Sequence, residues 1–176
     1  MLYREYLTAH FARGGDRVIA LLSLTLDSRP ETVWAALTEP DRLAQWLAPG
    51  RIELRLGGAA RLDFGDSGVV VDSRVTALQP QRLLEYSWSG PGDRLRPVRW
   101  SLESIGAQTR LELQLTLPAG EDVARAVAGW SAHLEMLAAV LAGAAVRFPL
   151  PTFHAARAAY SEQLETLEHQ RAASVG

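Results

Sequence analysis

The chain has 176 residues and a formal net charge of −2, which comes from 18 basic and 20 acidic side chains. Hydrophobic residues make up 48% of it and charged residues 22%, a balance that is typical of one globular domain and excludes a disordered chain. The near-neutral charge gives no footprint for nucleic acid or an anionic membrane, and the lack of cysteine excludes disulfides, thiolate metal sites and cysteine nucleophiles. Residues 1–17 contain no apolar segment of the signal-peptide type, so the sequence predicts a cytoplasmic protein.

The first elements in chain order are a helix, a strand and a pair of short helices. Four residues recur at helical spacing and predict a helix within residues 1–17, namely Tyr3, Tyr6, Leu7 and Phe11. Residues 18–26 are apolar with two polar interruptions, which predicts a strand. Two short helices follow, with Pro30 and Pro40 in their first turns, where proline is favoured.

Between residues 51 and 117, apolar and polar residues alternate, and turn-forming residues separate six segments. A period of two places alternate side chains on opposite faces, so this region predicts an antiparallel meander with one buried face. The predicted inward residues are, strand by strand, Ile52, Leu54 and Leu56; Ala60, Leu62 and Phe64; Val69, Val71 and Val75; Leu84, Tyr86 and Trp88; Val98, Trp100 and Leu102; and Leu111, Leu113, Leu115 and Leu117. One turn, Gly65-Asp66-Ser67-Gly68, also spells the nucleophile loop of chymotrypsin-like proteases, but its place between two strands favours a hairpin.

The rest of the chain predicts two further helices. Apolar residues at three- and four-residue steps predict a long helix over residues 123–141 that covers the buried face of the sheet. A second amphipathic helix is expected within residues 147–176, after the Pro149-Leu150-Pro151 break. This order of elements is the helix-grip topology, an α+β fold in which a curved antiparallel sheet surrounds a long helix. We therefore expect a helix-grip domain over residues 18–146 with helical extensions over residues 1–17 and 147–176.

Three separated groups of residues carry a family resemblance. They are Val33-Trp34-Ala35-Ala36-Leu37-Thr38 with Pro40, Leu43 and Gln45-Trp46; then Val75, Leu78, Pro80, Arg82-Leu83 and Tyr86-Ser87-Trp88; and finally Gly129-Trp130 with Leu134 and Leu137. In this order, over about residues 18–142, they resemble the START-like (SRPBCC) superfamily, in the branch named for homologues of the activator of the heat-shock-protein-90 ATPase. The resemblance implies a cavity for apolar ligands.

The inward face supplies the candidate ligand-binding residues. An aromatic and aliphatic wall with a few polar groups is typical of pockets for small molecules. The candidates are Trp46, Phe64, Val71, Ser73, Tyr86, Trp88, Trp100, Trp130, His133, Leu134 and Leu137. A filled hydrophobic core explains each residue singly, because burial of an aromatic side chain stabilises the fold by itself. For the set as a whole, the resemblance favours a cavity and a small apolar ligand.

No catalytic, metal-binding or cofactor-binding residue is predicted. The four histidines lie in separate segments, without the spacing of metal ligands, and no acidic residue occupies a clear inward position. We therefore expect a non-enzymatic binding protein. The alternatives are a cyclase- or hydrolase-like enzyme with Tyr86 or His133 as proton donor, and a chaperone-interacting module as the family name implies. The aromatic residues of the terminal helices predict either docking on the domain or a homodimer through these helices, and for the C-terminal helix we expect docking.

Overall fold

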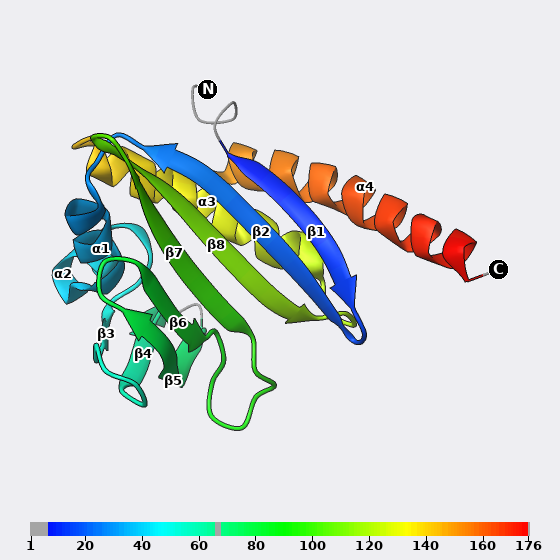
Figure 1. The fold of residues 1–176 in the computed structure, drawn as a ribbon, viewed down its shortest axis with the longest axis horizontal. Coiled ribbons are helices and arrows are strands. Elements are labelled where there is room, and N and C mark those ends of the chain that lie inside the picture. The colour runs from blue at the N-terminus through cyan, green and yellow to red at the C-terminus, as the bar shows by residue number, and fades with distance from the viewer. Residues whose placement is uncertain (1–6, 66–67, 176) are drawn as a thin grey trace.

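The computed structural model describes residues 7–65 and 68–175 and shows one antiparallel sheet with helices on one side (Figure 1). Its elements are β1 (Thr8–Gly14), β2 (Arg17–Leu26), α1 (Pro30–Thr38), α2 (Pro40–Trp46), β3 (Gly50–Ile52), β4 (Ala59–Asp63), β5 (Val70–Gln79), β6 (Leu83–Ser87), β7 (Pro97–Ile105), β8 (Gln108–Pro118), α3 (Val123–Leu141) and α4 (Leu150–Ser174). The eight strands lie in the order β1-β2-β8-β7-β6-β5-β4-β3. The predicted α+β helix-grip fold is confirmed.

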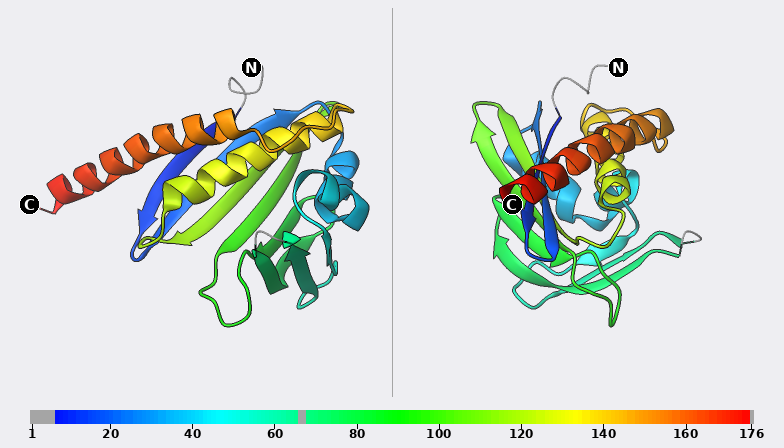
Figure 2. Two further views of the ribbon diagram at one scale, coloured as in Figure 1. Left: turned by 180° about the vertical axis from the view of Figure 1, so that it is seen from behind. Right: turned by 90° about the vertical axis from the view of Figure 1, so that its right-hand side faces the viewer.

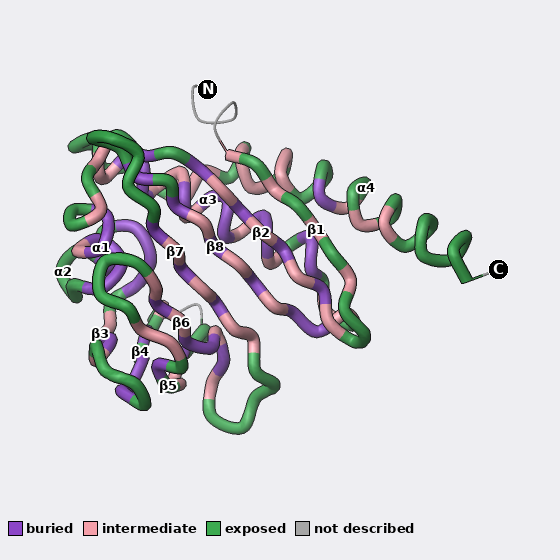
Figure 3. The backbone as a smooth tube through the Cα atoms, viewed as in Figure 1, coloured by how far each residue is buried: buried purple, intermediate pink, exposed green. Residues whose placement is uncertain are grey.

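Alternation along the central strands decides which face of the sheet is buried. In β8, Leu111, Leu113 and Leu115 are buried, while the residues between them are half-buried. Leu113 pairs with Leu22 of β2 on one side and with Trp100 of β7 on the other, so that inward residues of three strands meet in one layer. The alternation is visible along β2, β7 and β8 in Figure 3. The predicted inward residues are confirmed for β7 and β8.

Helix α3 covers the buried face, as its periodicity predicts (Figure 2). Its start is capped by Asp122, whose carboxylate accepts a hydrogen bond from the backbone N–H of Arg125 at 3.0 Å. Its residues Val127, Leu134 and Leu137 are fully buried. The predicted span of residues 123–141 is confirmed.

Helix α4 docks on α3 and on β1, which confirms the docking expected for the C-terminal helix. The rings of Tyr160 and Phe11 of β1 meet edge to face, with 5.4 Å between their centroids. The Tyr160 hydroxyl lies 2.8 Å from the hydroxyl of Ser131 on α3. An ion pair between Arg13 and Glu168 holds the helix farther along β1. The homodimer and the division into a domain with two extensions stay predictions.

The prediction of an N-terminal helix is wrong for the described part of that segment. Residues 8–14 form strand β1, which pairs with β2 along its whole length, from Thr8 opposite Ser23 to Gly14 opposite Arg17. A strand here satisfies the hydrogen-bonding groups along the edge of β2, which a helix would leave open. Tyr3 and Tyr6 lie outside the described residues.

The meander differs from prediction where turns interrupt the alternation. β3 ends at Ile52, and Leu54 and Leu56 are 46% and 67% exposed, because the chain turns back before β4. Gly57 has a φ of +75°, a conformation that favours glycine. Val69 precedes β5 and is also exposed. The hairpin predicted at Asp66 and Ser67 lies outside the described residues.

Candidate ligand-binding site

The predicted aromatic residues form a chain of edge-to-face contacts from the core towards the surface. Trp46 contacts Trp100 at 5.9 Å between ring centroids, and Trp100 contacts Trp130 at 5.6 Å. Trp130 contacts Trp88 at 4.6 Å, and Trp88 contacts Phe64 at 5.7 Å. Trp46 and Trp100 are 1% exposed, whereas Trp88 and Phe64 are half-buried. This series of aromatic rings is therefore buried in the core at the Trp46 end and partly exposed to solvent at the Phe64 end.

Six of the predicted site residues line neither of the two cavities described below, namely Trp46, Val71, Ser73, Tyr86, Trp100 and Leu137. The indole N–H of Trp46 donates to the carbonyl of Ala36 at 2.8 Å. Burial raises the pKa of the Tyr86 hydroxyl, and a hydrogen bond from Trp100 opposes this. Five of the six are buried in the hydrophobic core, so the filled-core interpretation describes them better. Ser73 is half-buried, and its hydroxyl donates to the carbonyl of Ser87 at 2.7 Å.

The open end of the aromatic chain borders a cavity of about 610 Å³, which we call the aromatic pocket. It is lined by Phe64, Val69, Trp88, Glu121, Asp122, Arg125, Ala126, Gly129, Trp130, His133, Phe148 and Phe153. Four of these were predicted: Phe64, Trp88, Trp130 and His133. Gly129 contributes to the hollow, because a Cβ added there would meet no other atom within 4 Å.

His133 supplies a polar group in this apolar lining. Its Nδ1 lies 2.9 Å from the backbone carbonyl of Trp46, and a carbonyl only accepts hydrogen bonds, so Nδ1 carries the proton. Burial lowers the pKa of His133, which keeps the ring neutral. Nε2 is then the unprotonated nitrogen, a hydrogen-bond acceptor on a residue that lines the pocket.

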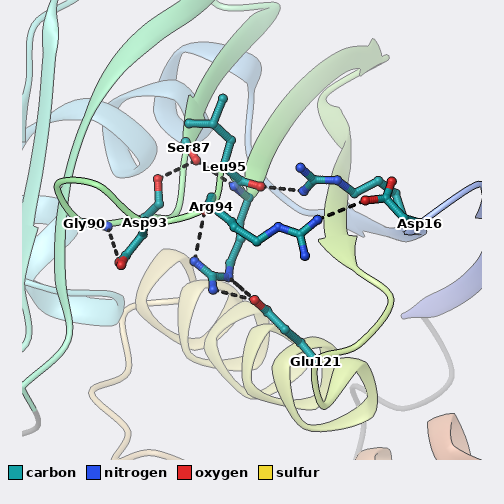
Figure 4. A network of polar contacts seen from close by, with 10 residues as sticks. Asp16, Ser87, Gly90, Asp93, Arg94, Leu95 and Glu121 are labelled. Carbon is teal, nitrogen blue, oxygen red and sulfur yellow. Dashed lines mark hydrogen bonds and ion pairs between the residues drawn. The ribbon is translucent and has the colours of Figure 1, made fainter.

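Charged residues lie at the rim of the aromatic pocket. Arg96 donates to both carboxylate oxygens of Glu121, which holds the pKa of Glu121 below its usual range. Figure 4 shows this contact within a network that also joins Arg94 to Asp16 at 3.0 Å. The network fixes the loop after Trp88 against the start of α3.

Asp122 is similarly held. The hydrogen bond from the backbone N–H of Arg125 and the contact with Arg157, whose Nη2 lies 2.8 Å from Asp122 Oδ2, lower the pKa of Asp122. Arg125 is exposed, and its guanidinium forms no ion pair with another residue of the described ranges. It is therefore the cation at this rim that is best able to meet an acceptor group on a ligand.

A second cavity, of about 1010 Å³, lies between α3, α4 and the end of β2, and we call it the alanine pocket. It is lined by Leu7, Leu24, Thr25, Leu26, Asp27, Ser28, Gln108, Ser131, Leu134, Glu135, Ala138, Leu141, Ala142, Thr152, Ala155, Ala156, Ala159 and Tyr160. Only Leu134 among the predicted site residues borders it. The alanines of α4, at helical spacing, are the signal in the sequence that indicates a close but hollow helix pair.

Neither a metal cluster nor a membrane span is found in the part of the chain that the structure describes. Across residues 7–65 and 68–175, no three His, Asp or Glu side chains lie close enough together to hold a metal ion. None of the helices in these ranges combines the length and the hydrophobicity of a membrane span.

Comparison with known proteins places the fold in a defined family. The sequence profile of the family described as activator of Hsp90 ATPase homolog 1-like protein matches residues 27–142. None of the curated proteins matches the sequence.

Solved structures share the fold over most of the chain. A conserved protein of unknown function from Enterococcus faecalis is 24% identical, with a TM-score of 0.75 over 91% of this chain and 92% of that one. CalU16 from Micromonospora echinospora is 23% identical, with a TM-score of 0.74 over 93% of this chain and 98% of that one. DynU16, a protein in the dynemicin biosynthetic locus, is 31% identical, with a TM-score of 0.65 over 77% of this chain and 51% of that one.

Proposed function

The chain belongs to the family of activator of Hsp90 ATPase homolog 1-like proteins, and from that premise we propose that it binds a small, planar, apolar ligand in the aromatic pocket without catalysing a reaction. The observation that carries this proposal is the convergence of Phe64, Trp88 and Trp130 on a cavity of about 610 Å³. Pockets for small molecules commonly hold about 300 to 1,000 Å³ and are mostly apolar with a few polar groups.

The ring geometry supports a planar ligand. Trp88 and Trp130 already meet edge to face, and a ligand ring added to such an arrangement gains about 0.5–1.5 kcal/mol for each well-placed aromatic contact beyond its apolar burial. His133 Nε2 provides an acceptor for a hydroxyl on the ligand, and Arg125 provides a donor at the rim.

The contacts of the acidic residues support binding over catalysis. Both carboxylates that line the aromatic pocket are held by arginine, Glu121 by Arg96 and Asp122 by Arg157. Tyr86, one of the two proton donors of the enzyme alternative, lies outside the pocket lining. The alternative therefore depends on His133 alone, and general acid–base catalysis usually employs a group with access to the reacting atom and a suitable pKa.

The setting of one relative agrees with this proposal. DynU16 is described as a protein in the dynemicin biosynthetic locus, and a module that receives a small molecule suits a biosynthetic setting. The cytoplasmic location, the homodimer and the chaperone interaction stay predictions, and none of them is needed for ligand binding in this pocket.

The test is isothermal titration calorimetry of the full chain with 2-naphthol, a planar apolar probe with one hydroxyl. Gly129→Leu fills the pocket from a position with open space, whereas Ala158→Leu adds a side chain at an exposed position of α4 outside both pockets. We expect binding to the natural chain, at least tenfold weaker binding to Gly129→Leu, and unchanged binding to Ala158→Leu. Equal affinity of all three proteins, or no binding at all, would overturn the proposal.

A second readout separates binding from catalysis. Mass spectrometry of 2-naphthol recovered after incubation with the protein detects any chemical change. We expect the bound compound to be recovered unchanged. A product that forms with the natural chain and not with His133→Gln would favour the enzyme alternative instead.

A further inference from the structure

The alanine pocket differs from the aromatic pocket in position and in the elements that build it. It uses another face of α3, through Leu134 and Ala138, and its opposite wall comes from α4. Both Leu7 and α4 lie outside residues 27–142, the part of the chain that matches the family. This cavity therefore depends on segments that the family resemblance does not describe.

Small side chains keep this cavity open. Helices that pack directly lie about 8–10 Å apart, and large residues at the contact fill the space between them. Here, the lining residues of α3, of its C-cap and of α4 include five alanines: Ala138, Ala142, Ala155, Ala156 and Ala159. The hydroxyls of Ser131 and Tyr160, 2.8 Å apart and buried, satisfy one another at the inner end. The two buried hydroxyls of the lining are thus paired with each other.

The charges around the cavity have one sign. Asp27 and Glu135 are the two charged residues of the lining, and neither arginine nor histidine is among the described residues that border it. Glu135 Oε2 accepts a hydrogen bond from Thr152 at 2.7 Å, and Asp27 Oδ1 accepts one from Gln108 at 2.5 Å. Neither carboxylate forms an ion pair with a residue of the described ranges, and each retains a second oxygen that can accept.

We propose that the alanine pocket is a second binding site, and that its ligand is an apolar molecule bearing a protonated amine. The apolar body buries against the leucine and alanine walls, and the ammonium group donates to the free carboxylate oxygen of Glu135, while the nearby Asp27 adds to the negative charge of the lining. Hydrogen bonds between ionised groups are stronger than those between neutral ones, and Glu135 is half-buried, where such a pair is less screened by solvent. A carboxylic acid of the same shape would bring a third negative charge to the rim.

The experiment compares three probes that share one hydrocarbon chain. Octylamine, octanol and octanoate are titrated into the full chain at pH 7 by isothermal titration calorimetry. We expect octylamine to bind at least tenfold more tightly than octanoate, with octanol between them. Octanoate binding as tightly as octylamine, or no detectable binding of octylamine, would overturn the proposal.

Variants locate the site. Glu135→Gln keeps the size of the side chain and an acceptor for Thr152 while it removes the charge, so octylamine affinity should fall about tenfold and octanol affinity should stay constant. Ala155→Leu fills the cavity and should abolish binding, whereas Ala158→Leu on the exposed side of α4 should leave it unchanged. An equal effect of the two leucine variants would contradict the assignment to this cavity.

The result is independent of the function proposed for the aromatic pocket. Binding of 2-naphthol is measured on the same variants, and Glu135→Gln should leave it unchanged. Circular dichroism confirms the fold of each variant, and Glu135→Gln still tests the proposal if Ala155→Leu fails to fold.

Discussion

The two pockets border one helix but differ in their walls and in their charges. The two carboxylates of the aromatic pocket are paired with arginine, whereas those of the alanine pocket have no ion pair among the described residues. The aromatic pocket has walls of Trp88, Trp130 and phenylalanine rings, with neutral His133 inside and the cation Arg125 at its rim. The alanine pocket has aliphatic walls and two carboxylates. The difference comes from the side chains that face α3 on each side. On one side they are Trp88 after β6, Phe64 after β4 and Phe153 of α4, and on the other they are the alanines of α4. A single scaffold helix can thus serve two sites whose selectivity is set by its neighbours.

The largest expected effect is on the free energy of unfolding, and it distinguishes Trp100 of the filled core from Trp88 of the pocket wall. Trp100→Ala removes a side chain that is 1% exposed between two other indoles, and such deletions cost about 3–5 kcal/mol of the free energy of unfolding. Trp88→Ala removes a half-buried ring at the pocket and should cost roughly half as much, with loss of naphthol binding. Urea denaturation measures both, and equal costs would show that Trp88 is also core.

The next effect is a pH dependence of the free energy of unfolding that comes from His133 in the aromatic pocket. In the unfolded chain, histidine has a pKa of about 6.5, and burial lowers the pKa of His133 in the folded state. Between these two values, the unfolded chain binds a proton that the folded chain does not, so stability falls as the pH drops below about 6.5, by at most about 1.4 kcal/mol per pH unit. His133→Gln should remove this component in urea denaturation measured between pH 7.5 and 5.5; an unchanged slope would exclude His133 as its source.

A smaller effect tests the inner end of the alanine pocket. Tyr160→Phe removes the hydroxyl that pairs with Ser131, and loss of a buried hydrogen bond between neutral groups costs about 1 kcal/mol. Thermal denaturation should show this loss, while 2-naphthol affinity stays constant because Tyr160 does not line the aromatic pocket. A weaker naphthol complex would mean that the two cavities are not separate.

The smallest effect is a gain in stability. Gly129 lies within α3, and a Cβ there meets no atom within 4 Å. Alanine in the interior of a helix is favoured over glycine by about 0.5–1 kcal/mol, so Gly129→Ala should raise the melting temperature. A lower melting temperature would show that the space beside Gly129 is occupied in solution.

The sequence predicts the fold where periodicity and packing agree. The alternation of β7 and β8 and the apolar stripe of α3 are long and regular, and the structure has each in its predicted place. The helix prediction for the N-terminal segment was wrong because the spacing of Leu7 and Phe11 fits a helix as well as it fits a strand. There, pairing with the edge of β2 decides the conformation, and pairing across the chain is not visible in local spacing.

The site was predictable only in part, for a related reason. Trp88 and Trp130 were identified from their inward positions, but the same rule selected Trp46 and Trp100, which lie deeper and fill the core. Depth along the buried face depends on how the helices lie across the sheet. Of the lining of the alanine pocket, the prediction included only Leu134, because the pocket exists only once α4 has docked on α3.

The first turn of α4 stands between the two cavities. Thr152 borders the alanine pocket, and the next residue, Phe153, borders the aromatic pocket. A displacement of this turn that widens one cavity therefore reshapes the other. Any coupling between two guests through this shared turn would be reciprocal, because thermodynamic linkage requires that each guest alter the affinity for the other by the same factor.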